Sequence, residues 1–231
     1  MSGGTQGEGA KRSVSEYFEA TASATLPIVK VYVGPERKLF IFPEVLLCDR
    51  FKFFRAAFES GFRESTEKSI DLPEDDPVAF LFVVDRALEG SLDIQKVANA
   101  KDVQLVICKA YILAQKLGRF DIAGDVGVAL IKYLSRIRVA LVDRIVCPRA
   151  VKLVYDNTTA TTTLRINIVQ VATDQYFASL CMSSSVLEKW LESVSSNSTF
   201  HLDVMKEIKQ RIAGSRARGW DCHTSECILR H

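Results

Sequence analysis

The residues that most often carry enzymatic chemistry are sparse in this sequence. Three histidines occur among 231 residues (His201, His223 and His231), and two of them lie in the last nine positions. A catalytic imidazole must be held in a fixed orientation, which a chain end seldom provides. No G-x-S-x-G sequence and no phosphate-binding loop occurs. We therefore expect a protein that is not an enzyme.

The adjacent carboxylates Asp75 and Asp76 are the one candidate acid/base pair. They lie between Pro73 and Pro77. Neighbouring carboxylates between two prolines are typical of a turn followed by a helix cap, because acid/base pairs need side chains that face each other across a substrate. We interpret them as turn and capping residues.

Cysteine and histidine gather near the end of the chain, at Cys222, His223, Cys227 and His231. These side chains could bind a soft metal, but their spacing matches no standard zinc module. We therefore expect no bound metal and no cofactor. The other four cysteines are isolated in apolar or helical contexts, which predicts free thiols rather than disulfides: Cys48, Cys108, Cys147 and Cys181.

Basic residues cluster before Trp220, at Lys206, Lys209, Arg211, Arg216 and Arg218. This is the charge type that binds nucleic acid, with one aromatic for stacking. Asp203 and Glu207 are interleaved with the cluster, and the net charge of the whole chain is only +2. A solvated helix face explains the pattern better, so nucleic acid is not an expected partner.

The composition, 48% hydrophobic and 25% charged, is that of an ordinary folded protein. The longest apolar runs break within about ten residues, short of the ~20 that a membrane helix needs. The Gly-rich, polar start of the chain has no apolar core of a secretory signal. These features predict a cytoplasmic and/or nuclear protein without a membrane segment.

The hydrophobic pattern predicts strands first and helices later. Alternation over 28–33, the turn at Gly34-Pro35 and a β-prone run over 38–42 indicate a hairpin, and residues 69–72 form a further short strand. Pro43 can lie in the first turn of a helix, which predicts a short helix through Val45, Leu46 and Leu47. Asp49 should cap the next helix, which carries apolar residues on one face: Phe53, Phe54, Ala57 and Phe58. Asp76 and Pro77 begin a helix that Gly90 ends.

Helical periodicity dominates the rest of the chain. One stripe comprises Val106, Ala110, Leu113 and Leu117, and the next Ile122, Val126, Ala129, Leu130 and Tyr133. We expect further helices over 139–146, around Leu187–Val194 and around Met205–Ile212. The sequence thus predicts an α+β fold followed by an all-α extension.

Six segments in order resemble the BTB/POZ domain. They are Val31–Gly34, Leu39–Leu46 (similar to F-x-V-H-K-x-L-L), Phe53–Phe58 (similar to Y-F-R-A-M-F), Phe62–Ser65, Ser69–Phe80 and Arg86–Gly90. Ala110–Leu117 is similar to the helix that follows in the family. Val154–Thr158 with Leu164-Arg165 is similar to the helical C-terminal extension of many fungal single-domain BTB proteins.

The resemblance implies a small sheet of three to five strands covered by helices. With it, we divide the chain into a disordered N-terminal arm (1–25), a BTB/POZ-like domain (26–134), a helical extension (135–213) and a flexible tail (214–231). Three positions depart from the family. Pro27 and Phe42 stand where the family often has an aspartate and a histidine, and Phe51 stands where it has a capping serine.

The resemblance also implies a protein–protein interaction module. Some BTB proteins recruit a cullin scaffold to a ubiquitin ligase, and an apolar-x-Glu motif contributes to that contact; Phe62, Arg63 and Glu64 occupy the matching positions. An aromatic anchor beside a charge is a physically reasonable hot spot. The alternative is that Phe62 packs on the edge of its own domain while Glu64 faces water.

Two other interactions follow from the resemblance. BTB domains often form homodimers through their first helices and swapped N-terminal strands, but the arm before Leu26 has no amphipathic helix of the required length. Some BTB domains are joined to zinc fingers in transcription-associated proteins. The basic C-terminal helix would serve that role here, although no zinc-finger spacing occurs in the sequence.

Overall fold

The computed structural model describes residues 26–90, 92–97, 100, 102–135, 145–180 and 184–217. Contacts between residues divide the chain into two compact units. The first is Met1–Pro77 with Val84–Ser91, and the second is Val78–Val83 with Leu92–His231. The sequence-based domain boundaries at 26, 135 and 214 stay predictions, and the arm over 1–25 lies outside the described residues.

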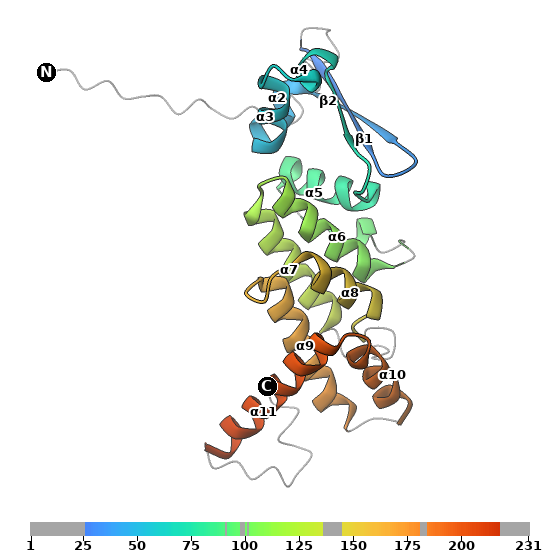
Figure 1. The fold of residues 1–231 in the computed structure, drawn as a ribbon, viewed down its shortest axis with the longest axis vertical. Helices are drawn as coiled ribbons and strands as arrows, with labels where there is room; N and C mark the ends of the chain where they lie inside the picture. Colours follow the sequence, from blue (N-terminus) through green and yellow to red (C-terminus); the bar gives the residue numbers. More distant parts are fainter. Residues whose placement is uncertain are drawn as a thin grey trace, which may run out of the picture. The chain divides into compact units, whose positions relative to one another are not determined.

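The first unit contains a three-stranded sheet of order β2-β1-β3 (Figure 1). Strand β1 (Ile28–Val33) pairs antiparallel with β2 (Lys38–Pro43) and parallel with β3 (Ser69–Leu72). Val29, Val31 and Val33 are fully buried, while the alternate residues face outward. The alternation therefore predicted both the hairpin and its buried face.

Glycine is required where β1 ends. Gly34 has a φ of +78°, and a Cβ there would lie 3.2 Å from Pro77 and 3.3 Å from the Asp75 carbonyl oxygen. The Gly34 N–H donates to the Leu72 carbonyl at 2.9 Å. A side chain would thus disturb both the hairpin turn and the β3–α5 connection.

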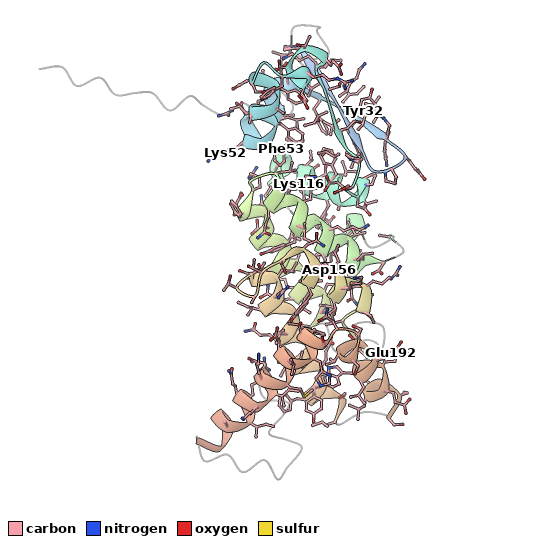
Figure 2. All side chains as sticks on the ribbon, in the orientation of Figure 1. Tyr32, Lys52, Phe53, Lys116, Asp156 and Glu192 are labelled. Carbon is pink, nitrogen blue, oxygen red and sulfur yellow. The ribbon has the colours of Figure 1, made fainter. Side chains whose placement is uncertain are left out.

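Three short helices follow the hairpin: α2 (Glu44–Arg50), α3 (Lys52–Glu59) and α4 (Arg63–Glu67). Phe51, Phe54 and Phe58 are buried and stack edge-to-face or in parallel, with ring centroids 5.6 and 6.2 Å apart. Of the expected α3 face, Phe54 and Phe58 are buried, while Phe53, labelled in Figure 2, and Ala57 are half-buried. The aromatic rings anchor this part of the core by area burial and ring geometry.

The expected short helix through Val45, Leu46 and Leu47 is confirmed as α2, and Pro43, with an extended ψ of 128°, is its N-cap, one residue before the first turn. The predicted start of the next helix is wrong. Asp49 does not cap α3: it lies inside α2, and the extended residue Phe51 (φ −135°, ψ 117°) both ends α2 and begins α3 without a side-chain cap. Phe51 is fully buried, so packing fixes this junction instead of a capping hydrogen bond.

Helix α5 (Pro77–Glu89) begins at its proline and ends before Gly90, as predicted. The apolar residues that recur along it at helical spacing are all buried: Phe80, Val83, Val84 and Ala87. A 3-10 turn, η1 (Ile94–Val97), follows before the second unit's long helices.

The second unit is helical in every described segment except its connections. Helices α6 (Val103–Lys116) and α7 (Phe120–Leu134) lie side by side (Figure 1), and both predicted stripes are buried except for half-buried Tyr133. The remaining helices are α8 (Pro148–Asn157), α9 (Thr163–Ser179), α10 (Ser184–Ser195) and α11 (Ser198–Ala217). The helix expected over 139–146 lies largely outside the described residues; Ile145 and Val146 are not helical.

Helix α9 is central to this unit, because it contacts α7, α8, α10 and α11. It buries polar as well as apolar residues, among them Asn167, Thr173 and Gln175. Trp190 on α10 is 1% exposed and donates its indole N–H to the Ala172 carbonyl on α9 at 2.7 Å. These polar contacts fix how α9 and α10 pack.

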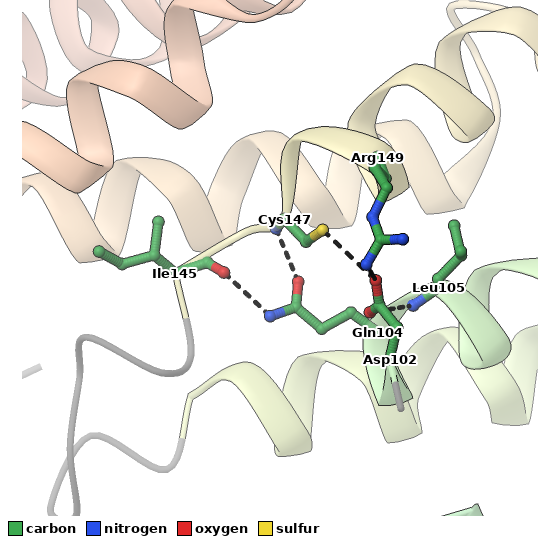
Figure 3. Close-up of polar contacts among 6 residues, drawn as sticks. All are labelled: Asp102, Gln104, Leu105, Ile145, Cys147 and Arg149. Atoms are coloured by element: carbon green, nitrogen blue, oxygen red, sulfur yellow. Dashed lines mark hydrogen bonds and ion pairs between the residues drawn. The ribbon is translucent and has the colours of Figure 1, made fainter. Parts of the chain in front are cut away.

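The extended residues Ile145–Cys147 are held by side chains from three helices. The Gln104 amide on α6 donates to the Ile145 carbonyl at 2.9 Å and accepts from the Cys147 N–H at 2.8 Å (Figure 3). The Val146 N–H donates to the Gln175 side chain at 3.3 Å, and the Ser193 hydroxyl donates to the Val146 carbonyl. Side chains thus satisfy the Ile145 carbonyl, both backbone groups of Val146 and the Cys147 N–H, while the Cys147 carbonyl accepts from the Val151 N–H at 3.0 Å.

An ion pair also connects the start of α6 with α8. Asp102 caps α6 by accepting from the Leu105 N–H at 3.2 Å, and its other carboxylate oxygen lies 2.7 Å from Arg149 Nη2 on α8 (Figure 3). One carboxylate thus stabilises the start of α6 and links it to α8.

The residues that resemble a fungal BTB extension contact one another at the corner between α8 and α9. The Arg165 guanidinium lies 4.1 Å from the centre of the Tyr155 ring and donates to the Tyr155 carbonyl at 2.6 Å. Its Nε donates to the Thr158 hydroxyl at 3.2 Å. The Tyr155 hydroxyl donates to Asp203 on α11 at 3.0 Å, and burial together with this carboxylate raises the pKa of Tyr155. These residues have a structural role.

The described chain is therefore a mixed α+β protein, with one small sheet and many helices. None of its described helices combines the length and apolar character needed to cross a bilayer. The described cysteines Cys48, Cys108 and Cys147 are free thiols, as predicted.

Candidate protein-docking site

The candidate site predicted from the sequence lies at the turn between α3 and α4. Ser60 ends α3, Gly61 takes a φ of +76°, and Phe62 is the extended N-cap of α4. The positive φ is available to glycine without strain, so the chain can turn sharply here and expose the following residue. Phe62, Arg63 and Glu64 are consecutive at this corner.

Phe62 is 71% exposed, the largest exposed fraction among the described large apolar side chains. The interpretation in which it packs on the edge of its own domain is therefore wrong. Exposure of a whole aromatic ring is unfavourable unless a partner covers it.

The three residues of the predicted site differ in their exposure and in whether their side chains are already paired within the protein. Arg63 is exposed but forms an ion pair with Glu67 one turn later, with Nε 2.6 Å from Oε1. This hydrogen bond lowers the pKa of Glu67 and raises the pKa of Arg63. Glu64 is half-buried on the first turn of α4. Phe62 and Glu64 thus remain the candidate contact residues of the predicted site, while Arg63 pairs within α4.

Both ends of α4 are held in place. The Ser65 N–H and hydroxyl donate to the Phe62 carbonyl at 3.0 and 2.9 Å. At the other end, Lys68 Nζ lies 2.7 Å from a carboxylate oxygen of Glu44 on α2. Because these contacts fix the turn before any partner arrives, little ordering would accompany binding.

A surface depression of about 400 Å³ lies between α2 and α3 in the same unit, and sequence reasoning did not find it. It is lined by Pro27, Glu44, Val45, Cys48, Asp49, Arg55 and Glu59. The Arg55 guanidinium donates to the Cys48 carbonyl at 3.1 Å and lies 3.7 Å from Asp49. Burial, and then Glu44 and Glu59, raise the pKa of Cys48 to about 11, so its thiol is protonated and not a nucleophile at neutral pH.

The positions that depart from the BTB pattern have local packing roles. Phe42 is 7% exposed, and the Pro27 carbonyl accepts a hydrogen bond from the Glu44 N–H at 2.9 Å. Phe42 thus packs in the core where the family often has a histidine, whereas Pro27 is exposed and contributes a backbone hydrogen bond.

The basic residues of α11 are largely neutralised where the structure describes them. Arg211 contacts Asp174 and lies 2.8 Å from Glu207, and Lys206 lies 3.5 Å from Asp203. The side chains of Arg216, Arg218 and Trp220 lie outside the description. Solvated ion pairs, rather than a field of free cations, characterise the described part of this helix.

The remaining sequence candidates do not form a site in the described chain. Asp75 lies in the turn after β3, where its N–H donates to the Leu72 carbonyl at 3.3 Å. The described residues include no group of three or more His, Cys, Asp or Glu side chains placed to hold a metal. Cys222, His223, Cys227 and His231 lie outside the described residues.

No protein-family model matches the chain, and no curated protein matches it in sequence.

Proposed function

We propose that this protein is a non-enzymatic protein–protein interaction module of the BTB/POZ type, and that it serves as an adaptor for a cullin scaffold. The observation that carries the proposal is the exposed ring of Phe62 on a turn that the fold holds rigid. The resemblance of the ordered segments from Val31 to Gly90, and the order of strands and helices, support the family.

Phe62 has the properties of an interface anchor. A phenylalanine ring buries a large apolar area when a partner covers it, with only two side-chain torsions to restrict. Glu64, two residues further along, adds a charge that selects a partner with a matching donor. Together they are a compact hot spot rather than a broad surface.

The test is co-purification of a cullin with the full chain. We expect wild type to retain the cullin and the double variant Phe62→Ala/Glu64→Ala to lose binding by at least about tenfold, which corresponds to about 1.4 kcal/mol. The matched control is Phe120→Ala, since Phe120 is 70% exposed at the start of α7. This control should bind as wild type does.

Two results would contradict the proposal. Wild type that retains no cullin excludes the adaptor role, and a double variant that binds as tightly as wild type excludes this turn as the contact. Circular dichroism spectra of all variants should overlay, because Phe62 is exposed and contributes little to the core.

A further inference from the structure

Strand β2 forms an open edge of the sheet. It is the outer strand in the order β2-β1-β3 and pairs only with β1 among the described strands. An open edge has backbone N–H and C=O groups without strand partners, which are a template for another extended chain.

The hydrogen bonds of β1 show which residues of β2 face this edge. The Lys30 and Gly34 N–H groups donate toward β3, to the Lys68 and Leu72 carbonyls, both at 2.9 Å. Backbone groups alternate in direction along a strand, so Val29, Val31 and Val33 bond to β2.

The partners of those three valines in β2 are Phe42, Phe40 and Lys38. The backbone groups of the residues between them, Leu39 and Ile41, therefore point away from β1, toward the open edge.

The side chains along this edge are apolar. Leu39 is 45% exposed and Ile41 is 50% exposed, and they lie on the outer face of the sheet. Native edges are usually protected by charges, prolines or bulges. Here Lys38 and Pro43 stand only at the ends of β2, and residues 39–42 are continuously apolar.

We propose that the β2 edge pairs antiparallel with the β2 edge of a second copy of this chain, forming a symmetric dimer with a continuous six-stranded sheet. The pairing centres on Phe40, which places Leu39 opposite Ile41 of the second copy and Ile41 opposite Leu39. Each of these two residue pairs exchanges two backbone hydrogen bonds, so every N–H and C=O group of Leu39 and Ile41 is satisfied.

This register is favourable for the side chains as well. The exposed Leu39 and Ile41 side chains cover those of the second copy on the outer face, and the two Phe40 rings become cross-strand neighbours. Lys38 lies opposite Phe42, so the two Lys38 ammonium groups are at opposite ends of the interface. Like charges are thereby kept apart, and no other charged residue lies within β2.

The inference does not depend on the proposed function, because Phe62 lies at the turn before α4 and not on β2. It also differs from the dimer that the BTB resemblance implies, which uses first helices and swapped N-terminal strands.

The test is the molar mass of the full chain by size-exclusion chromatography with light scattering, from about 1 to about 200 μM, a range that covers micromolar dissociation constants. We expect wild type to approach twice 25.8 kDa as concentration rises. Ile41→Pro removes the one N–H of that residue, which β1 does not use, and proline is tolerated at sheet edges. We expect this variant to stay monomeric over the whole range.

A second variant and a control complete the experiment. Ile41→Lys adds a charge to the edge without altering the backbone, and it should also be monomeric. Ile41→Val keeps both the N–H and an apolar side chain and should dimerise as wild type does. Wild type that is monomeric at about 200 μM, or a dimer that persists unchanged in Ile41→Pro and Ile41→Lys, overturns the proposal.

Discussion

The hydrogen bonds from Gln104, Gln175 and Ser193 to the backbone of Ile145–Cys147 form a side-chain clamp on this segment. The clamp predicts a large loss of stability for one substitution in the interior. Replacing Gln104 with leucine keeps the side-chain volume but removes the donor to the Ile145 carbonyl and the acceptor for the Cys147 N–H. Gln104 and Ile145 are 7% and 9% exposed, so water cannot readily replace the lost donor, while Cys147 is half-buried.

The magnitude follows from these exposures. An unsatisfied buried backbone group costs about 1–3 kcal/mol, and a group that water can reach costs less. We therefore expect Gln104→Leu to lower the free energy of unfolding by about 2–4 kcal/mol. The matched control is Gln115→Leu on the same helix, where the half-buried Gln115 amide makes one long contact of 3.3 Å with the Tyr111 hydroxyl. This control should cost less than about 1 kcal/mol.

The assay is urea unfolding followed by tryptophan fluorescence. The chain has two tryptophans, so a Trp220→Phe background leaves Trp190 as the single fluorescent reporter. Trp190 lies on α10, the helix whose Ser193 donates to the Val146 carbonyl. A loss below about 1 kcal/mol, or one equal to that of Gln115→Leu, would refute the reasoning, since the clamp would then add nothing beyond an ordinary exposed hydrogen bond.

Two further predictions concern ionisable groups. The pKa of Cys48 is raised to about 11, so we expect its alkylation by iodoacetamide to be slow at pH 8 and to accelerate only above about pH 10; rapid labelling at pH 8 by mass spectrometry would contradict this. The hydrogen bond from Arg119 lowers the pKa of Asp121 from 3.8 to about 2. Because the pKa of Asp121 is lower in the folded state, its carboxylate stabilises the fold above about pH 4. This stabilisation is at most about 1 kcal/mol, because the side chain is 61% exposed. It is lost as the pH falls from about 4 to about 2. Arg119→Ala should raise the pKa of Asp121, measured by NMR, toward 3.8, and an unchanged pKa would exclude Arg119 as the main cause.

Much of the fold could be predicted from the sequence, because many helices and strands have one face buried and the other exposed to solvent. The valines of β1 alternate, and the stripes of α5, α6 and α7 repeat at helical spacing, so each revealed its element. Helix α9 left no such pattern. It contacts four helices and buries Asn167, Thr173 and Gln175, so its polar residues do not mark a solvent face.

The remaining errors arise from contacts between distant residues. Phe51 replaces a capping side chain by packing in the core, and Ile145–Cys147 stays extended because Gln104, 41 residues away, bonds to its backbone. For the candidate site, motif resemblance placed Phe62 and Glu64 on the turn, but the pairing of Arg63 with Glu67 depends on the rotamers of one helical turn. The outward direction of Leu39 and Ile41 required the full strand order.

The clamp on Ile145–Cys147 has a consequence for how the chain is made. During synthesis, Gln104 leaves the ribosome before the segment that it holds, but Gln175 and Ser193 follow 29 and 47 residues after Val146. Until they emerge, the amide and carbonyl of Val146 have only water as partners. The second unit therefore cannot complete these contacts before Ser193 has been synthesised, although α6 and α7, which contact each other, both precede the segment in the chain.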